Sequence, residues 1–83
     1  NVNRVVPDAD LRSETMTMAR TFASGPRFAY RYIKRNMNVA EEGDIGKSLD
    51  SEAYGMLRCR DSADHAEAAR AFVEKRAPNW VGR

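Results

Sequence analysis

Apolar and small side chains recur at helical spacing along three stretches of the 83-residue chain. Intervals of three or four residues place each set on one face of an α-helix. The first set consists of Leu11, Thr15, Met18 and Phe22, the second of Ala29, Ile33, Met37 and Ala40, and the third of Ile45, Leu49, Ala53, Met56 and Leu57. The pattern therefore predicts three consecutive helices.

Helix-breaking residues separate these stretches. Gly25 can adopt the left-handed conformation that closes a helix, and Pro26 can begin the next one. Gly43 is expected to end the second helix and Asp44 to cap the third. Ser62 is then expected to cap a fourth helix, whose charges suit the helix dipole, acidic at its start and basic in its last turn: Asp64, Glu67, Lys75 and Arg76.

The first seven residues differ from the rest. Val5 and Val6 are β-branched and are followed by Pro7, which is typical of the end of a strand. No second strand is predicted, and the chain does not begin with Met. We therefore expect residues 1–7 to end the last strand of a core that lies in a longer protein. Residues 8–83 would be an all-α segment of about four helices.

The composition predicts a thin hydrophobic core. Hydrophobic residues make up 42% of the chain, but many are alanines, which bury little surface. A core at this length supplies roughly 3–5 kcal/mol at most. Cys59 is the one cysteine and His65 the one histidine, so an internal disulfide is impossible and a zinc site would lack ligands. The segment is therefore expected to pack against a partner.

The charge is nearly balanced, which argues against several classes of partner. The net charge is +2 with both signs interspersed, so nucleic acid is not the expected partner. No stretch is long and apolar enough to cross a membrane. An unpaired cysteine fits a reducing compartment, and the predicted location is cytoplasmic.

Three groups could carry chemistry, and each has a plainer interpretation. Carboxylates at 41–44 and 50–52 could act as acids and bases, but they lie on polar faces or at caps. Cys59 and His65 could pair as nucleophile and base, yet no third residue would orient them. Residues 30–35 interleave tyrosines with cations, as nucleic-acid surfaces do, although neighbours on a helix point in different directions. We assign no catalytic residue and no metal ligand.

Phe72 and Lys75 are the remaining candidates. They are three residues apart and would share one helix face. A ring beside an ammonium could cover a base and meet a phosphate. From spacing alone, the favoured interpretation is a core phenylalanine and a surface lysine.

The order of motifs resembles the C-terminal part of the enoyl-CoA hydratase/isomerase (crotonase-like) family. Members typically end in A-F-x-E-K-R-x-P-x-F/W-x-G-R, and residues 71–83 read AFVEKRAPNWVGR. S-x-D-x-x-E-G precedes that phrase in the family, and residues 62–68 read SADHAEA, with Ala68 in place of the usual glycine. Residues 2–11, VNRVVPDADL, are similar to the strand that leads into the family's C-terminal helices.

The resemblance implies a function for the assembled protein. The family's catalytic carboxylates and oxyanion hole would lie in a missing N-terminal core, and the helices would form trimers, often paired into hexamers. Phe72 and Lys75 would hold the adenine and 3′-phosphate end of CoA across a subunit interface, with acyl-CoA as the substrate and no separate cofactor. We expect a protein that hydrates 2-enoyl-CoA, with this segment inactive alone. The alternative is a stand-alone helical module that binds protein or nucleic acid.

Overall fold

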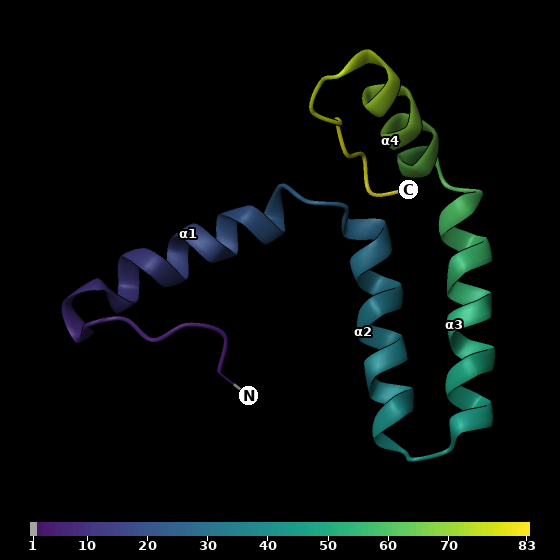
Figure 1. The fold of residues 1–83 in the computed structure, drawn as a ribbon, viewed down its shortest axis with the longest axis horizontal. Coiled ribbons are helices and arrows are strands. Elements are labelled where there is room, and N and C mark those ends of the chain that lie inside the picture. Colours follow the sequence, from purple (N-terminus) through teal and green to yellow (C-terminus); the bar gives the residue numbers. More distant parts are fainter. Residues whose placement is uncertain (1) are drawn as a thin grey trace.

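The computed structural model describes residues 2–83, and these residues form helices joined by short loops (Figure 1). The elements in chain order are the 3₁₀ turn η1 (Asp8–Asp10) and the helices α1 (Leu11–Ala23), α2 (Arg27–Glu41), α3 (Ile45–Arg60) and α4 (Ala63–Glu74). The prediction of an all-α segment with four helices is confirmed.

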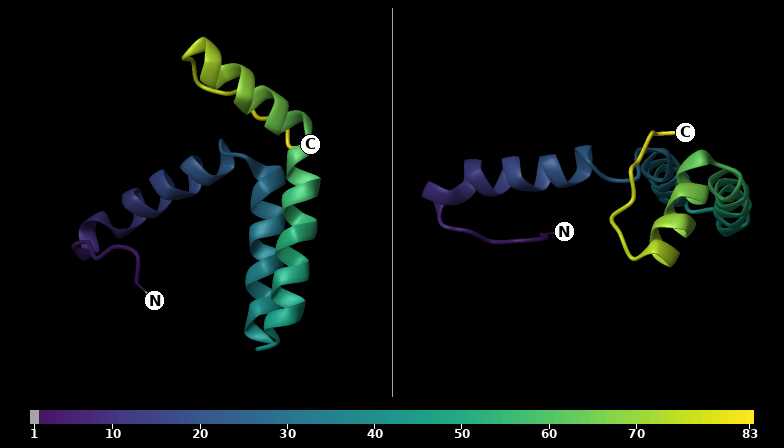
Figure 2. Two further views of the ribbon diagram at one scale, coloured as in Figure 1. Left: turned by 45° about the vertical axis from the view of Figure 1, so that its right-hand side comes forward. Right: turned by 90° about the horizontal axis from the view of Figure 1, so that it is seen from above.

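The helices make an open, flat arrangement. Helices α2 and α3 run side by side as an antiparallel hairpin, α4 lies across one end of it, and α1 projects away on its own (Figures 1 and 2). The radius of gyration is 16.0 Å with extents of 43 × 41 × 17 Å. A compact domain of this length would have a radius near 12 Å. The chain therefore does not close around a core of its own.

The expected strand at the N-terminal end does not form within residues 2–83. Residues 2–7 run as irregular chain before η1, and residue 1 lies outside the described residues. A strand exists only through hydrogen bonds to a neighbouring strand, and the described part of the chain offers none. That these residues end the strand of a larger sheet stays a prediction.

The predicted caps of α3 and α4 are present. The Asp44 carboxylate accepts a hydrogen bond from the Lys47 backbone N–H at 3.0 Å. The Ser62 hydroxyl likewise accepts from the His65 backbone N–H at 3.1 Å. Gly43 follows α2 with a φ of 79°, a conformation that a residue with a Cβ rarely adopts. Local sequence therefore fixes where these helices begin and end.

The role predicted for Gly25 was wrong, since its backbone is not left-handed. Gly25 is buried in the elbow between α1 and α2, where the Tyr30 side chain lies directly against it. A Cβ at this position would lie 2.1 Å from the Tyr30 hydroxyl oxygen. The Tyr30 ring also meets the Phe22 ring edge-on, at 5.8 Å between centroids. Glycine is needed here because an aromatic side chain occupies the space.

The seam between α2 and α3 combines small and polar residues with aromatic side chains, and the Tyr32 ring meets the Tyr54 ring at 6.1 Å between centroids. Tyr32 packs on Gly55, where an added Cβ would lie 3.3 Å from the tyrosine Cβ. Further along the seam, the Ser51 hydroxyl donates to the Asn36 side-chain oxygen at 2.8 Å. The small side chains let the two helix backbones approach closely, and the polar pair is satisfied internally.

The large apolar residues that the pattern assigned to helix faces point outward instead. Exposed members include Leu11, Ile33, Met37, Ile45, Leu49 and Met56, and the one fully buried hydrophobic side chain among residues 2–83 is Ala71. The accessible surface is 6965 Å², whereas a compact protein of this mass exposes about 5,000 Å². Roughly 2,000 Å² of additional surface is thus exposed. This area exceeds the surface of about 800 Å² that each partner buries in a standard protein interface.

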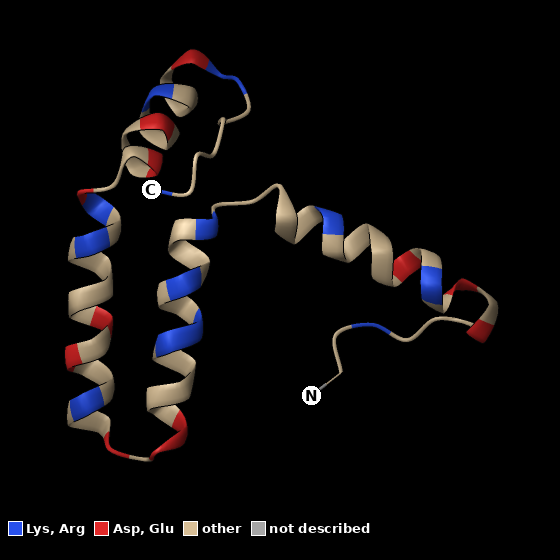
Figure 3. Ribbon diagram, turned by 180° about the vertical axis from the view of Figure 1, so that it is seen from behind, with Lys and Arg blue, Asp and Glu red and all other residues tan. Residues whose placement is uncertain are grey.

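Charge is unevenly distributed along the α2–α3 hairpin (Figure 3). Basic residues predominate in the part of α2 nearer α4, whereas acidic residues lie at the tip and partway along α3, with Lys47 among them. Two arginines of α2 stack on rings: Arg31 lies 5.7 Å from the centroid of Phe28, and Arg35 lies 5.0 Å from that of Tyr54. The contact of Arg31 favours a basic residue in the first half of α2, where the helix dipole alone would disfavour it.

Replacing Gly25 by alanine should destabilise the elbow between α1 and α2. The added methyl group forces Tyr30 out of its place, and overpacking of this kind costs about 1–3 kcal/mol. A lowered urea midpoint for the Gly25→Ala protein would show it. In a Tyr30→Ala background the same substitution should cost much less, because the clash is gone. An equal cost in both backgrounds would contradict this explanation.

Candidate functional site

The end of α4 carries an unusual backbone conformation at Lys75. Its φ and ψ are 54° and 44°, and it is the one non-glycine residue among residues 2–83 with a positive φ. The Lys75 N–H donates to the Phe72 carbonyl at 3.3 Å, and the Arg76 N–H donates to the Ala71 carbonyl at 3.0 Å. This is the Schellman pattern, in which glycine is the usual left-handed residue. Lysine here costs about 1 kcal/mol or more in backbone strain.

The two predicted site residues therefore do not share a regular helix face as expected. Phe72 belongs to the last turn of α4, whereas Lys75 lies just beyond the helix end. The Phe72 side chain is 85% exposed, and Lys75 is also exposed. Both side chains are thus exposed at the end of α4, and a backbone hydrogen bond joins the two residues. A core role for Phe72 within this chain is excluded.

Arg76 lies outside α4 as well, and two carboxylates bind it. Its guanidinium donates to Glu67 at 2.5 Å and to Glu74 at 2.6 Å. The same Glu67 oxygen accepts from the Asn79 backbone N–H at 3.1 Å. Glu67 thus holds the chain at two points beyond the helix, and its side chain is only 16% exposed.

This network changes the ionisation of its members. Hydrogen bonds from Arg76 and from the Asn79 N–H lower the pKa of Glu67 to about 2. The same pairing, with Glu67 first and Glu74 second, raises the pKa of Arg76 above its ordinary value. Both shifts favour the charged pair, so the network is fully formed at neutral pH.

Asp64 holds the far end of the same C-terminal tail. It is 4% exposed, and its carboxylate accepts from the backbone N–H of Val81 at 2.7 Å and of Gly82 at 3.0 Å. Its own backbone N–H donates to the Arg83 carbonyl at 2.9 Å. The buried carboxylate is therefore satisfied by main-chain donors, which clamp the tail along α4.

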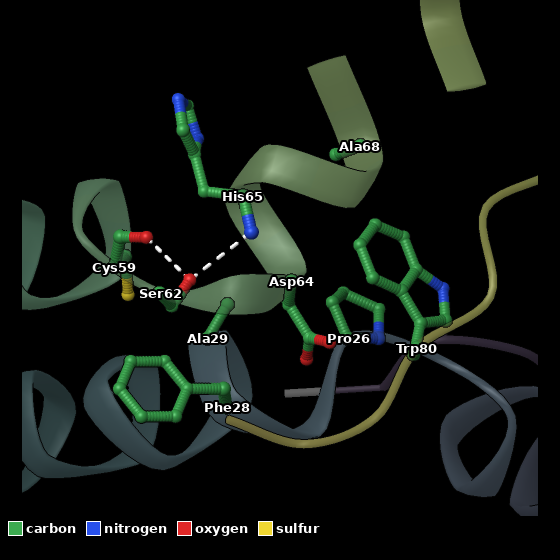
Figure 4. A pocket seen from close by; sticks show the side chains of 9 residues that line it. All are labelled: Pro26, Phe28, Ala29, Cys59, Ser62, Asp64, His65, Ala68 and Trp80. Carbon is green, nitrogen blue, oxygen red and sulfur yellow. Dashed lines mark hydrogen bonds between the residues drawn. The ribbon is translucent and has the colours of Figure 1, made fainter. Parts of the chain in front are cut away.

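A small hollow lies where the tail, α4 and the start of α2 meet (Figure 4). It has a volume of about 160 Å³, and its lining is mainly apolar: Pro26, Phe28, Ala29, Cys59, Ser62, Asp64, His65, Ala68 and Trp80. Trp80 lies beside Pro26 and Ala68, whereas the His65 ring points away from the hollow. The Ser62 hydroxyl donates to the Cys59 carbonyl at 2.5 Å. Cys59 and His65 are not arranged as a nucleophile with its base.

The other candidate groups have structural surroundings. The carboxylates at 41–44 and 50–52 are exposed, and Asp44 caps α3. Tyr30 and Tyr32 are half-buried against Gly25 and Gly55, so their rings are not displayed beside the cations of residues 30–35. The Tyr32 hydroxyl accepts from Arg58 at 3.4 Å, which raises the arginine pKa.

Residues 2–83 contain no group of three metal-binding side chains close enough to share an ion. None of the helices they form has the length and apolar character to cross a membrane.

Sequence reasoning missed the contacts by which Asp64 and Glu67 hold residues 76–83 against α4, which we call the tail clamp. Asp64 and Glu67 were interpreted as acids that suit the helix dipole, and Arg76 as part of the last turn. The signal was present, because residues at i and i+3 lie on one helix face. The acidic pair therefore faces one segment of chain. That this segment would be residues 76–83 depends on the reversal at Lys75, which helix propensity does not predict.

Comparison with known proteins is consistent with this geometry. A family model described as enoyl-CoA hydratase/isomerase matches residues 2–83. The chain belongs to the enoyl-CoA hydratase/isomerase family. A crystal structure of an enoyl-CoA hydratase from Geobacillus kaustophilus HTA426 superposes with a TM-score of 0.88 at 34% identity, over 99% of this chain and 31% of that one.

Curated relatives have several different activities. The chain is 34% identical to 1,2-epoxyphenylacetyl-CoA isomerase of Escherichia coli K12, over 96% of the chain and 30% of the relative. It is 36% identical to methylmalonyl-CoA decarboxylase of the same organism, over 98% and 32%. A probable enoyl-CoA hydratase of Rhodobacter capsulatus is 32% identical, over 94% and 30%. The chain thus spans about a third of the length of these relatives.

Acid should release the tail as Glu67 becomes protonated. Its pKa is about 2 when folded and 4.5 otherwise, so its stabilisation is complete above pH 4.5 and is lost as the pH falls towards 2. Trp80 is the only tryptophan of the chain, and its fluorescence should shift to the red over that range. A Glu67→Gln chain should lack this part of the transition. An identical titration in both would contradict the assignment.

Proposed function

We propose that this chain is the C-terminal helical part of an acyl-CoA enzyme and supplies both subunit contacts and one side of the CoA site. The reaction proposed for the whole protein is hydration of a 2-enoyl-CoA to a 3-hydroxyacyl-CoA. Family membership and names among the relatives that include hydratases support this assignment. The observation that carries it is the exposed pair at the end of α4, Phe72 and Lys75.

The chemistry of this pair suits the nucleotide end of CoA. An adenine ring can stack on the exposed face of Phe72, and a phosphate can pair with the Lys75 ammonium. Lys75 has no ion pair among residues 2–83, although five other cations of the chain do. An exposed pair of this kind binds weakly alone, because the side of the ligand that faces away from the protein would remain solvated. A second surface is therefore proposed to close the site.

Subunit contact would provide that second surface. The additional 2,000 Å² or so of exposed surface, much of it apolar, is what an oligomerising segment is expected to carry. We propose a trimer, or a pair of trimers, in which these helices pack on a core and on neighbouring subunits. Proton transfer and stabilisation of the thioester enolate would come from residues in the two thirds of the relatives that the chain does not cover.

Replacing Lys75 with alanine in the natural full-length protein should weaken CoA binding. Loss of a hydrogen bond to a charged group costs about 1.5–3 kcal/mol, or roughly 10- to 150-fold in affinity. Turnover at saturating substrate should change little, because the contact is remote from the reacting thioester. Calorimetric titration with CoA, together with kcat and KM for an enoyl-CoA, measures both effects.

Lys34→Ala is the matched control, since Lys34 is an exposed lysine in the middle of α2. Its affinity for CoA should equal that of the unmodified protein. If Lys75→Ala also leaves the affinity unchanged, Lys75 has no part in the site.

The 83-residue chain on its own should be helical but self-associating, and it should not hydrate an enoyl-CoA. Sedimentation equilibrium should give a mass above 9.4 kDa, and the native protein in its source cell should be several times longer. A monomer that melts cooperatively at high temperature would contradict the oligomerisation proposal. A native chain of only 83 residues would overturn the enzyme assignment in favour of a stand-alone binding module.

A further inference from the structure

Glu67 lies on the side of α4 that faces the tail, and it fixes the chain immediately after Lys75. One of its oxygens accepts from the Arg76 guanidinium at 2.5 Å and from the Asn79 N–H at 3.1 Å. Lys75 directly precedes Arg76, so its backbone cannot relax from the left-handed region unless Arg76 moves. The contacts of Arg76 therefore add to the hydrogen bond from the Lys75 N–H to the Phe72 carbonyl in holding the strained conformation of Lys75.

The same network controls the charge around Lys75. Glu74 is its neighbour in the sequence and would be a competing partner for the ammonium. Arg76 binds Glu74 at 2.6 Å and also binds Glu67. Arg76 therefore engages both carboxylates nearest the helix end, and Arg70 adds a second cation beside Glu67 at 3.7 Å. The Lys75 ammonium is left available for an anion outside the chain.

We propose that Glu67, acting through Arg76, is a positioning residue that sets the backbone of Lys75 and keeps its ammonium unpaired for a phosphate of an acyl-CoA. The proposal rests on the proposed function of Lys75. It assigns to Glu67 no contact with the ligand.

The test uses the natural full-length protein and adenosine 3′,5′-bisphosphate as a probe for the nucleotide end of CoA. Glu67→Ala should weaken binding of the probe about tenfold and raise KM for an enoyl-CoA in proportion, with kcat unchanged. Glu67→Gln retains an acceptor oxygen and should lose less. Asp64→Asn loosens the tail at residues 81–82, away from Arg76, and should leave binding within about twofold.

A double variant separates this proposal from the one on which it rests. In a Lys75→Ala background, Glu67→Ala should cause no further loss, because its effect passes through the lysine. Losses that add, or an Asp64→Asn variant as weak as Glu67→Ala, would overturn the positioning role. A Lys75→Ala protein that binds normally would overturn the proposed function itself. If Lys75→Ala weakens binding and Glu67→Ala and Glu67→Gln do not, only the positioning role fails.

Discussion

The close approach of α2 and α3 at Tyr32 and Gly55 determines how the rest of the surface is used. An added Cβ at Gly55 would be 3.3 Å from Tyr32, and the Tyr32 ring also meets that of Tyr54, so aromatic rings and small residues fill the seam. The polar pair Ser51–Asn36 completes it. Because this seam consumes little apolar surface, the long aliphatic side chains of both helices remain outside it. The hairpin is held by shape, aromatic contacts and hydrogen bonding, and its hydrophobic surface stays exposed.

The C-terminal end follows a different rule, since charged groups organise it. Asp64 and Glu67 bind main-chain donors and Arg76, and they fold residues 76–83 back along α4. The reversal requires a left-handed residue at position 75, and a lysine occupies it. A glycine would be less strained there. The strained residue thus lies at the helix end where Phe72 and Lys75 are exposed, and this coincidence connects the tail to the proposed function.

The exposed apolar faces of the hairpin and the charged C-terminal end both belong to a chain of the enoyl-CoA hydratase/isomerase family. The relatives, each about three times as long as this chain, include an isomerase, a decarboxylase and a probable hydratase. Their similarity to the whole of this chain indicates that the helical scaffold is compatible with several reactions on CoA thioesters. The features that vary between those reactions are expected elsewhere in the longer proteins. The open shape, the outward apolar faces and the exposed end of α4 are what such a scaffold would share.

Sequence by itself determined the number of helices, their breaks and the caps at Asp44 and Ser62, because these depend on neighbouring residues along the chain. It also placed Phe72 and Lys75 near each other. Tertiary structure decided which faces pack: the periodic apolar sets point outward, and Tyr32, Gly55 and Gly25 form the contacts. Periodicity shows that a face is apolar but not what covers it. The tail clamp was likewise decided in three dimensions, because the reversal at Lys75 is stabilised by Glu67 and Arg76, nine residues apart in sequence, and opposes the local preference of lysine.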